Sequence, residues 1–364
     1  MPALLVAPAL AGSLSLRQWE TVIVQARKSR LLGRLHHIIE RHGLSGQVPD
    51  RVWDHLVSAD RLVVEQHRSL SHEIRQILEA LKTVQARIVV LKGGAYVLRG
   101  LDAGCGRTFS DIDILVPREK LGEVEARLML NGWVSQHRDA YDQRYYRKWM
   151  HEIPPMSHIR RGTTLDIHHA LTPLTSRIRA DSDAMLAAAE PLANHDRLMV
   201  LSPQDMVLHS ATHLFLESEF HSGLRDLVDL HALITEFRHC VPDFDQSVLS
   251  RAREVGLERP LVLAFNYLIR ILSLDVSASI ASELEHVLKG KPYQALLDGL
   301  FVRALSPQHE SAMDAFTPAS LFLLYIRGHW LRMPMHLLVA HLGYKAIMKL
   351  TKKADNDGNE ETVR

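Results

Sequence analysis

RTFSDIDILVP, residues 107–117, places two aspartates one residue apart within an otherwise apolar stretch. Its aliphatic and β-branched residues, followed by Pro117, predict a short buried strand. Side chains two positions apart on a strand point to the same face, so we expect Asp111 and Asp113 to lie side by side. Adjacent carboxylates repel each other, and a bound cation would relieve that repulsion. The pattern is also compatible with an edge strand that carries two solvated acids.

A third aspartate has a matching setting in TTLDIHH, residues 163–169. On a strand, Asp166 and His168 share one face, while Leu165 and Ile167 share the other. If this strand neighbours the first one, three carboxylates converge. His168 then orients Asp166, contacts substrate or pairs with a neighbouring strand.

Paired glycines in LKGGA, residues 91–95, follow a strand-like RIVV and precede a short helical stretch. Backbone N–H groups at such a turn can hold a phosphate, although most turns of this kind bind nothing. Mg²⁺ prefers oxygen ligands and typically combines one or two carboxylates with substrate phosphates. Paired glycines, an Asp-x-Asp strand and a later strand aspartate together predict a site for a metal ion and a polyphosphate.

The bulk composition is that of a folded protein without a strong charge bias. Of its 364 residues, 46% are apolar and 23% are charged, and 43 Lys and Arg balance 42 Asp and Glu. This balance, and the lack of a basic stripe with interleaved aromatic residues, argue against a nucleic-acid partner. The two cysteines provide neither a disulfide framework nor a zinc site, so we expect a reducing, cytoplasmic environment and no zinc.

We expect neither a signal peptide nor a transmembrane segment. The start, MPALLVAPALAGSLSL, lacks a basic region and is interrupted by Pro2 and Pro8. Residues 318–341 are apolar, but Arg327, Arg332 and Pro334 interrupt them before the roughly 20 clean residues that a bilayer needs. We expect a pair of buried or partner-facing helices there, so the C-terminal helices are a candidate surface for a protein partner.

Helix signals divide the chain into regions. Ser15 and Gln18 predict a capping box that opens a helix, and a second long helix runs from about residue 49 to 84. Ser202, with Pro203 at the first helical position, opens a mostly helical part. We predict N-terminal helices (1–84), an α/β core (85–200), a helical domain (201–350) and a disordered tail (351–364). Within the core, YDQRYYRKW (141–149) is expected to be a strand pair lining the cleft.

Two histidines, His209 and His213, stand four residues apart on a predicted helix. A zinc-protease helix would need glutamate after the first histidine, where this chain has serine, and a metal phosphohydrolase would need an adjacent His-Asp pair. We therefore expect partly buried histidines that bond within the helical region. Arg225, Asp226 and Asp229 follow at helical spacing, which predicts ion pairs within the helix and between regions.

These motifs together resemble the nucleotidyltransferase superfamily of DNA polymerase β. Within it, VVLKGGA (89–95), SDIDILVP (110–117), NGW (131–133) and LDIHHAL (165–171) resemble the bacterial family called uncharacterised nucleotidyltransferases. The segments WETVIVQARKSRLLGRL (19–35), LSPQDMVLHSATHLF (201–215), LRDLVDLHALI (224–234) and WLRMPMHLLVAHL (330–342) look like the same family. The resemblance implies an α+β fold: a polymerase-β-like nucleotidyltransferase α/β core with a mixed sheet, flanked by N-terminal helices and a larger C-terminal helical lobe.

For the metal site, the resemblance implies that Asp111, Asp113 and Asp166 ligate Mg²⁺ or Mn²⁺. Asp166 would complete the site of the catalytic metal and help to deprotonate the attacking hydroxyl. The implied reaction transfers a nucleoside monophosphate from an NTP to an acceptor hydroxyl by a two-metal-ion mechanism.

For the nucleotide, the resemblance implies that Gly93 and Gly94 hold the triphosphate through backbone N–H groups. Lys92 and Arg107 are candidates for neutralising phosphate charge, and Ser110 for a phosphate contact. A surface amine at residue 92 and a loop-bonded hydroxyl at residue 110 are the alternatives for those two positions.

The acceptor stays open among a small molecule, a glycan precursor and a protein side chain. Two departures from the superfamily pattern leave a catalytically silent interaction protein, or an antitoxin-like one, as the alternative function. Gly94 stands where much of the superfamily has serine, and the loop from Gly94 to Asp111 is longer than usual. Three intact carboxylates favour the enzyme.

Overall fold

A seven-stranded mixed sheet forms the centre of the α/β region in the computed structural model, which describes residues 1–339 except 138, 194–196 and 292. The strand order is β3-β4-β5-β2-β1-β7-β6. The strands are β1 (Ile88–Val90), β2 (Asp111–Leu115), β3 (Trp133–Ser135), β4 (Met156–His158), β5 (Thr164–His168), β6 (Glu190–Pro191) and β7 (Leu198–Val200). Strand β2 is parallel to β5 and antiparallel to β1, so the predicted mixed sheet is confirmed.

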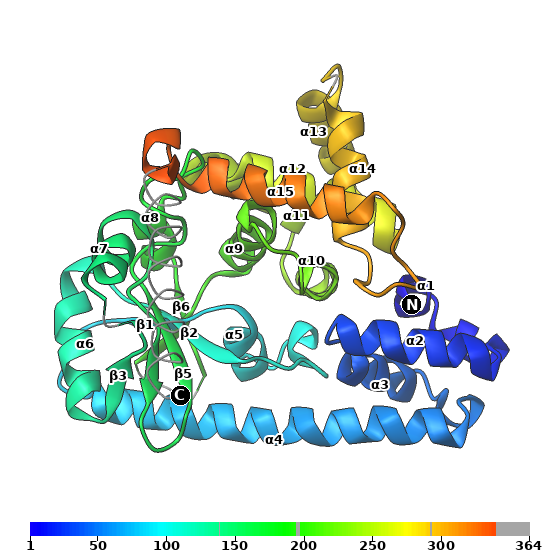
Figure 1. Ribbon diagram of the computed structural model, residues 1–364, viewed down its shortest axis with the longest axis horizontal. Coiled ribbons are helices and arrows are strands. Elements are labelled where there is room, and N and C mark those ends of the chain that lie inside the picture. The colour runs from blue at the N-terminus through cyan, green and yellow to red at the C-terminus, as the bar shows by residue number, and fades with distance from the viewer. Residues whose placement is uncertain (138, 194–196, 292, 340–364) are drawn as a thin grey trace, which may run out of the picture.

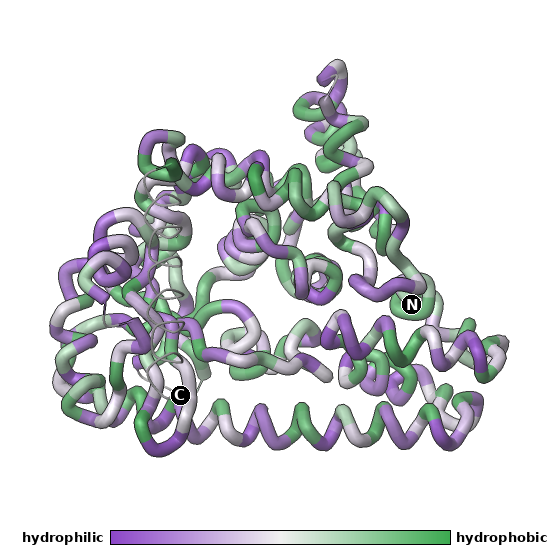
Figure 2. Tube along the Cα trace, viewed as in Figure 1, coloured by the Kyte–Doolittle hydropathy of each residue, from purple (hydrophilic) through white to green (hydrophobic). Residues whose placement is uncertain are grey.

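Four α-helices form the N-terminal region, and the second and third pack along the very long fourth one. They are α1 (Pro2–Val6), α2 (Leu16–Lys28), α3 (Leu32–Arg41) and α4 (Asp50–Ala80). The predicted capping box at Ser15 is present, and it opens α2. Helix α4 runs beneath both α2–α3 and the sheet (Figure 1), and polar and apolar residues alternate along it (Figure 2). Its first half buries Leu56 in a core with Trp19, whereas its second half buries Leu70 and Ile74 in the main core.

Four helices lie within or beside the sheet region. They are α5 (Lys92–Leu98), α6 (Leu121–Leu130), α7 (Ala140–Trp149) and α8 (Ser182–Ala187). The expected strand pair at 141–149 is wrong, because these residues form α7. The Asp139 side chain accepts the Tyr141 N–H and caps the helix. Tyr145 and Trp149 lie one helical turn apart, and their ring centroids are 5.9 Å apart. The helix therefore lets these aromatic side chains pack on each other, although both residue types also favour strands.

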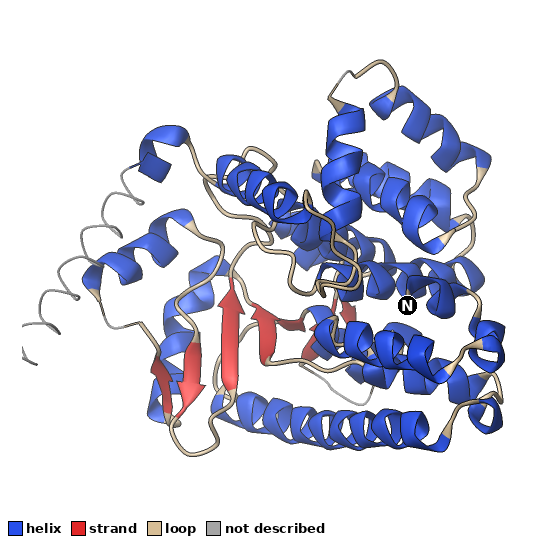
Figure 3. Cartoon of the chain, turned by 45° about the vertical axis from the view of Figure 1, so that its right-hand side comes forward, coloured by secondary structure: helices blue, strands red, loops and turns tan. Residues whose placement is uncertain are grey.

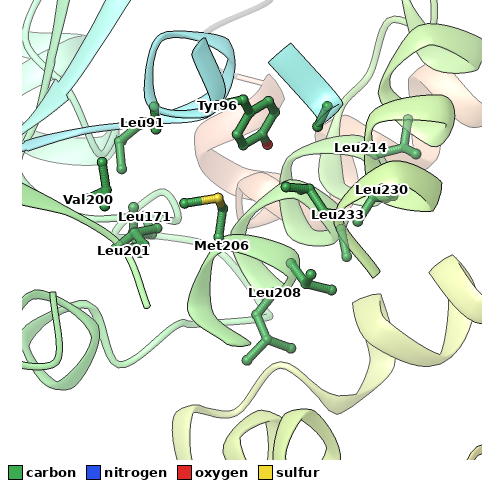
Figure 4. Close-up of a cluster of buried hydrophobic side chains, with 14 of the residues drawn as sticks. Leu91, Tyr96, Leu171, Val200, Leu201, Met206, Leu208, Leu214, Leu230 and Leu233 are labelled. Carbon is green, nitrogen blue, oxygen red and sulfur yellow. The ribbon is translucent and has the colours of Figure 1, made fainter. Parts of the chain in front are cut away.

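The remaining helices lie on the side of the sheet opposite α4 (Figure 3), and the pair between residues 278 and 304 projects away from the sheet (Figure 1). They are α9 (Pro203–Leu216), α10 (Gly223–Cys240), α11 (Phe244–Val255), α12 (Glu258–Leu272), α13 (Ala278–Leu288), α14 (Gln294–Ala304) and α15 (Thr317–Arg332). Ser202 caps α9 as predicted, by accepting the Asp205 N–H. Figure 4 shows Leu91 and Val200 of the sheet region in one cluster with Leu214 of α9 and Leu230 of α10. This shared core fixes the C-terminal helices against the sheet.

The apolar stretch 318–341 contains a helix break, as expected. Helix α15 ends at Arg332, and helical structure resumes at residue 335 and continues to residue 339. Phe322, Leu323 and Ile326 on α15 are exposed, and a partner for this surface stays a prediction. Within the described residues no helix has the length and apolar character to cross a bilayer. The tail 351–364 lies outside the described residues, and the predicted domain boundaries stay predictions.

Candidate active site

Strands β2 and β5 bring the three predicted carboxylates together. The two strands are parallel and in register, with Asp113 opposite Asp166, so these side chains stand next to each other on one face of the sheet. Asp111 comes two residues before Asp113 and points to the same face. The expectation that the two strands are neighbours is confirmed, and the roles of the carboxylates stay predictions.

Asp113 is buried, and neighbouring protein groups compensate its negative charge. Lys92 Nζ donates to Asp113 Oδ1 at 2.7 Å, and His168 Nε2 lies 3.0 Å from the same oxygen. Burial alone would raise the pKa of Asp113, but the charges and hydrogen bonds of Lys92 and His168 outweigh it and hold that pKa well below its usual range. Of the three roles open to His168, the structure therefore shows pairing with the neighbouring strand.

Asp166 has the opposite environment. Its Oδ1 is buried and has no hydrogen-bond partner within the described part of the chain. Burial, and then the negative charges of Asp113, Glu152 and Asp111, raise the pKa of Asp166 to about 7. A carboxylate in this position gains most from a proton or a cation.

The oxygen donors here fit a hard divalent ion. Asp166 leaves one buried carboxylate oxygen without a donor, and Asp111 and Asp166 line the same pocket. Carboxylate oxygens are the ligands that Mg²⁺ and Mn²⁺ prefer. The types of donor present therefore suit the predicted ions, and Asp111, Asp113 and Asp166 as their ligands stay a prediction.

Two adjoining pockets open over the carboxylates. The larger, of about 350 Å³, is lined by Asp166 and by residues of α9, α10 and α15. The smaller, of about 140 Å³, is lined by Gly93, Gly94 and Asp113. The residues that line both pockets are Lys92, Asp111, His213 and Arg225. The two pockets are therefore two ends of one polar cleft that has the carboxylates at its centre.

Packing leaves little room for a side chain at Gly93 and Gly94, and the backbone of these residues lines the smaller pocket. A Cβ atom on Gly93 would lie 1.7 Å from Arg107 Nη1, and one on Gly94 would lie 3.0 Å from Val90 Cγ1. Serine at position 94 would therefore crowd the strand beneath it. Helix α5 has only seven residues, so any phosphate contact here depends on backbone N–H groups rather than on a long helix dipole.

The remaining predicted phosphate ligands already have protein partners. Arg107 is buried, and its Nε donates to Asp229 Oδ2 at 2.6 Å, which confirms an ion pair between regions. Ser110 Oγ donates to Asp111 Oδ1 at 3.0 Å. Lys92 is held by Asp113 and is not a free surface amine. All three line the smaller pocket, so a ligand there would share or replace these contacts.

Several residues that face the cleft were not predicted for the site, among them Glu152 and His213. Glu152 lines the larger pocket, and its Oε2 lies 3.6 Å from His168 Nε2. It stands in an irregular segment, MHEIPPM (150–156), where no periodic pattern could have identified it. His213 lines both pockets, and burial and the Lys92 charge hold its pKa well below the usual value, so its ring is neutral. His209, one turn earlier on α9, is buried, and its predicted bonding within the helical region stays a prediction.

A second polar cluster lies away from the cleft. Potential ligand atoms of His37, Asp102 and Cys105 lie within 4.8 Å of one another, a grouping that the sequence did not indicate. Arg34 and Arg41 both contact the Asp102 carboxylate, so protein cations already compensate its charge. The cluster links α3 to the loop that precedes β2.

Comparison with protein families identifies the chain. The model of the family described as uncharacterised nucleotidyltransferase matches residues 15–273. The chain belongs to the uncharacterised nucleotidyltransferase family. The family match spans the whole sheet and α2 to α12, so it includes all the residues of the carboxylate cluster and the glycine turn. The family and the mixed sheet together confirm the predicted α+β fold.

Among solved structures, the chain is similar to the antibiotic-resistance factor ANT(2'')-Ia. The two chains are 14% identical, the match covers 50% of this chain and 97% of that one, and the TM-score is 0.30. A score this low supports no argument about fold or substrate. No curated protein matches the chain. The family description names nucleotidyl transfer in general and no acceptor.

Proposed function

We propose that this protein transfers a nucleoside monophosphate from an NTP to an acceptor hydroxyl with the help of Mg²⁺ or Mn²⁺. The observation that carries the proposal is the in-register pairing of Asp113 with Asp166, next to Asp111 and the Gly93–Gly94 turn. A silent scaffold would gain nothing from holding Asp166 with a pKa near 7 among other carboxylates. The ion, when bound, would neutralise phosphate charge and polarise the bond that breaks.

The two ends of the cleft suggest where each substrate binds. The triphosphate fits the smaller pocket, where Gly93, Gly94 and Ser110 offer backbone and hydroxyl donors and Arg107 would share its charge between Asp229 and a phosphate. The acceptor fits the larger pocket, where about 350 Å³ is enough for a small polar molecule or one side chain of a larger partner.

The chain itself can receive the proton that the acceptor hydroxyl loses. Asp166 and Glu152 both line the larger pocket, and the raised pKa of Asp166, about 7, matches a proton acceptor that works near neutral pH. Neutral His213, at the junction of the two pockets, can hold the hydroxyl in line with the phosphate by one hydrogen bond.

Calorimetric titration with each of the four NTPs, in Mg²⁺ and in chelator, tests the proposal. We expect at least one NTP to bind only when Mg²⁺ or Mn²⁺ is present. A zinc-selective chelator should leave that binding unchanged. The lack of any NTP affinity in the presence of either ion would end the enzyme proposal.

Mass spectrometry then addresses the acceptor. The protein, the bound NTP and a fractionated cell extract are incubated together, and products heavier by one nucleoside monophosphate are sought. Asp111→Asn is the matched control because it removes one carboxylate from the cleft and keeps the side-chain shape. A product formed equally by the wild type and by this variant would not come from the proposed site.

A further inference from the structure

The smaller pocket is lined by four basic residues that come from all three parts of the chain. They are Arg30, Lys92, Arg107 and Arg225. Three of them contact carboxylates, in the pairs Lys92–Asp113, Arg107–Asp229 and Arg225–Asp226. Within the part of the chain that the structure describes, the Arg30 guanidinium contacts no carboxylate. Its charge is therefore available to an anion in the pocket.

The backbone of Arg30 has a conformation that normally selects glycine. The residue follows the end of α2 and has a φ of 55°. A left-handed residue just after a helix is most often glycine, since any side chain costs stability there. Lys92 is another of the four described non-glycine residues with positive φ, and it lines the same pocket. Strained residues collect at ligand sites, so two strained cations at one pocket indicate a ligand.

Close backbone packing holds Arg30 next to the cleft. A Cβ atom on Gly106, in the loop before β2, would lie 2.3 Å from the Gly33 carbonyl oxygen at the start of α3. Only glycine allows the two backbones to approach in this way. Arg34 also donates to the Cys105 carbonyl oxygen at 3.3 Å. The long loop between α5 and β2 therefore docks the N-terminal helices against the site (Figure 1).

The two pockets indicate which part of a nucleotide Arg30 would meet. Asp166 and Glu152 line only the larger pocket, and Arg30 lines only the smaller one. An in-line displacement at phosphorus places the attacking oxygen and the leaving oxygen on opposite sides. A hydroxyl that attacks from the side of Asp166 therefore expels pyrophosphate toward Arg30.

We propose that Arg30 binds the β- and γ-phosphates of the NTP and stabilises the pyrophosphate that leaves. A bond forms between the acceptor oxygen and the α-phosphorus, and the bond from that phosphorus to the bridging oxygen breaks. The electron pair stays on pyrophosphate, and a carboxylate of the larger pocket takes the hydroxyl proton. Guanidinium pairs with phosphate through two parallel hydrogen bonds. This inference rests on the proposed nucleotidyl transfer and adds a ligand contact from the N-terminal helices.

Binding of magnesium pyrophosphate to the full chain, measured by calorimetry for wild type and Arg30→Gly, tests the inference. Pyrophosphate is common to all NTPs, so the base does not need to be known. We expect the affinity to fall about tenfold or more, the typical effect of losing a charge-assisted contact. Without ligand, the melting temperature should rise by about 1–2 °C because glycine relieves the left-handed backbone. Arg30→Lys keeps the charge but not the paired donors, and should bind with intermediate affinity.

Two variants separate this effect from charge and backbone effects. Lys28→Ala removes an exposed positive charge from the last turn of α2, at a residue that lines neither pocket. Ser273→Gly relieves a φ of 51° after α12, also outside both pockets. Both should bind magnesium pyrophosphate as the wild type does, and Ser273→Gly should show the same small rise in melting temperature.

Each outcome decides the proposal. Affinity of Arg30→Gly within twofold of the wild type would overturn the role of Arg30 and leave nucleotidyl transfer standing, provided that the wild type binds a magnesium NTP. A lower melting temperature of unliganded Arg30→Gly would overturn it too, because Arg30 would then support the fold. A wild type that binds neither magnesium pyrophosphate nor any NTP would remove both proposals.

Discussion

Strands β2 and β5 carry aspartates at matching positions, yet their electrostatics are opposite. Asp113 on β2 accepts hydrogen bonds from Lys92 and His168, and its pKa is held well below the usual range. On β5, burial and neighbouring carboxylates raise the pKa of Asp166 to about 7. The repulsion between the carboxylates therefore acts mainly on Asp166, because Lys92 and His168 compensate the charge of Asp113. One carboxylate anchors the site, and the other stays reactive toward a proton or a cation.

This difference changes the effect on stability that we predict for removing Asp113. Two aspartates on one strand predict mutual repulsion, so removal of Asp113 would be expected to stabilise the protein without metal. The structure predicts the reverse, because Asp113 compensates the buried charge of Lys92. The following predictions test that contrast, in order of the size of effect.

The largest effect is expected for Asp113→Asn in metal-free buffer at pH 7. The variant keeps the side-chain shape but leaves Lys92 without its counter-charge, which costs about 3 kcal/mol when one partner of a buried pair is lost. Urea titration measures the free energy of unfolding, with Asp54→Asn on the exposed surface of α4 as the control. A variant more stable than the wild type would show that repulsion dominates at Asp113.

The stabilisation that a ligand provides should show whether Asp166 on β5 belongs to the ligand site. At an Mg²⁺–NTP concentration 100 times the dissociation constant, the wild type should gain about 2.7 kcal/mol of stability. Asp166→Asn should gain about 1 kcal/mol or less at the same concentrations, because it lacks one metal-binding carboxylate and binds more weakly. Thermal melts with and without ligand measure the gain. Equal gains in the two proteins would remove Asp166 from the ligand site.

The pH dependence of stability without metal should expose Asp166 directly. Its pKa is about 7 in the folded protein and near 3.8 in the unfolded chain, so the folded state binds the extra proton between these values. The contribution of Asp166 to stability therefore falls as pH rises from about 4 to 7, and the full cost is present above pH 7. Asp166→Asn removes this titration.

The difference in stability between Asp166→Asn and the wild type should therefore shift in favour of the variant as the pH rises from 5 to 8. After allowance for partial solvent exposure, we expect a gain of about 1–2 kcal/mol. Urea titrations at the two pH values, in chelator, measure it. A difference between variant and wild type that does not change with pH would show that Asp166 titrates near its ordinary value.

The smallest effect is expected for Glu152→Gln. Glu152 is one of the charges that raise the pKa of Asp166, so its removal should lower that pKa toward its ordinary value. The loss of stability between pH 5 and pH 8 should therefore be about 0.5–1 kcal/mol smaller in Glu152→Gln than in the wild type. Glu119→Gln, away from the cleft, is the control for loss of one negative charge. An unchanged slope would place Glu152 too far from Asp166 to influence it.

Local patterns in the sequence were enough for several elements. The capping box at Ser15 and the Ser202–Pro203 helix start are both present, because a cap is made by residues three positions apart. The tyrosines and tryptophan of α7 favour strands, which is why composition predicts strands there, but the Asp139 cap and the helical spacing of these side chains stabilise a helix.

Local patterns did not identify the residues that only the fold brings to the cleft. Glu152 reaches it from an irregular segment, and His213 and Arg225 reach it from helices far along the chain. Arg30 lies more than 60 residues before the glycine turn, and it lines the pocket beside the close packing of Gly33 on Gly106. None of these contacts leaves a periodic trace in sequence, because each depends on packing between distant segments.

The sequence by itself determined the α+β fold, the family and the carboxylates that face one side of the sheet. Strand alternation and the Asp-x-Asp spacing are local, so a few consecutive residues fix them. Only the tertiary structure decided which carboxylate is compensated. Lys92 comes from the turn after β1 and His168 from the end of β5, and both approach Asp113 rather than Asp166. The pKa of each aspartate depends on charges a few ångströms away in space, and distance along the chain does not reveal them.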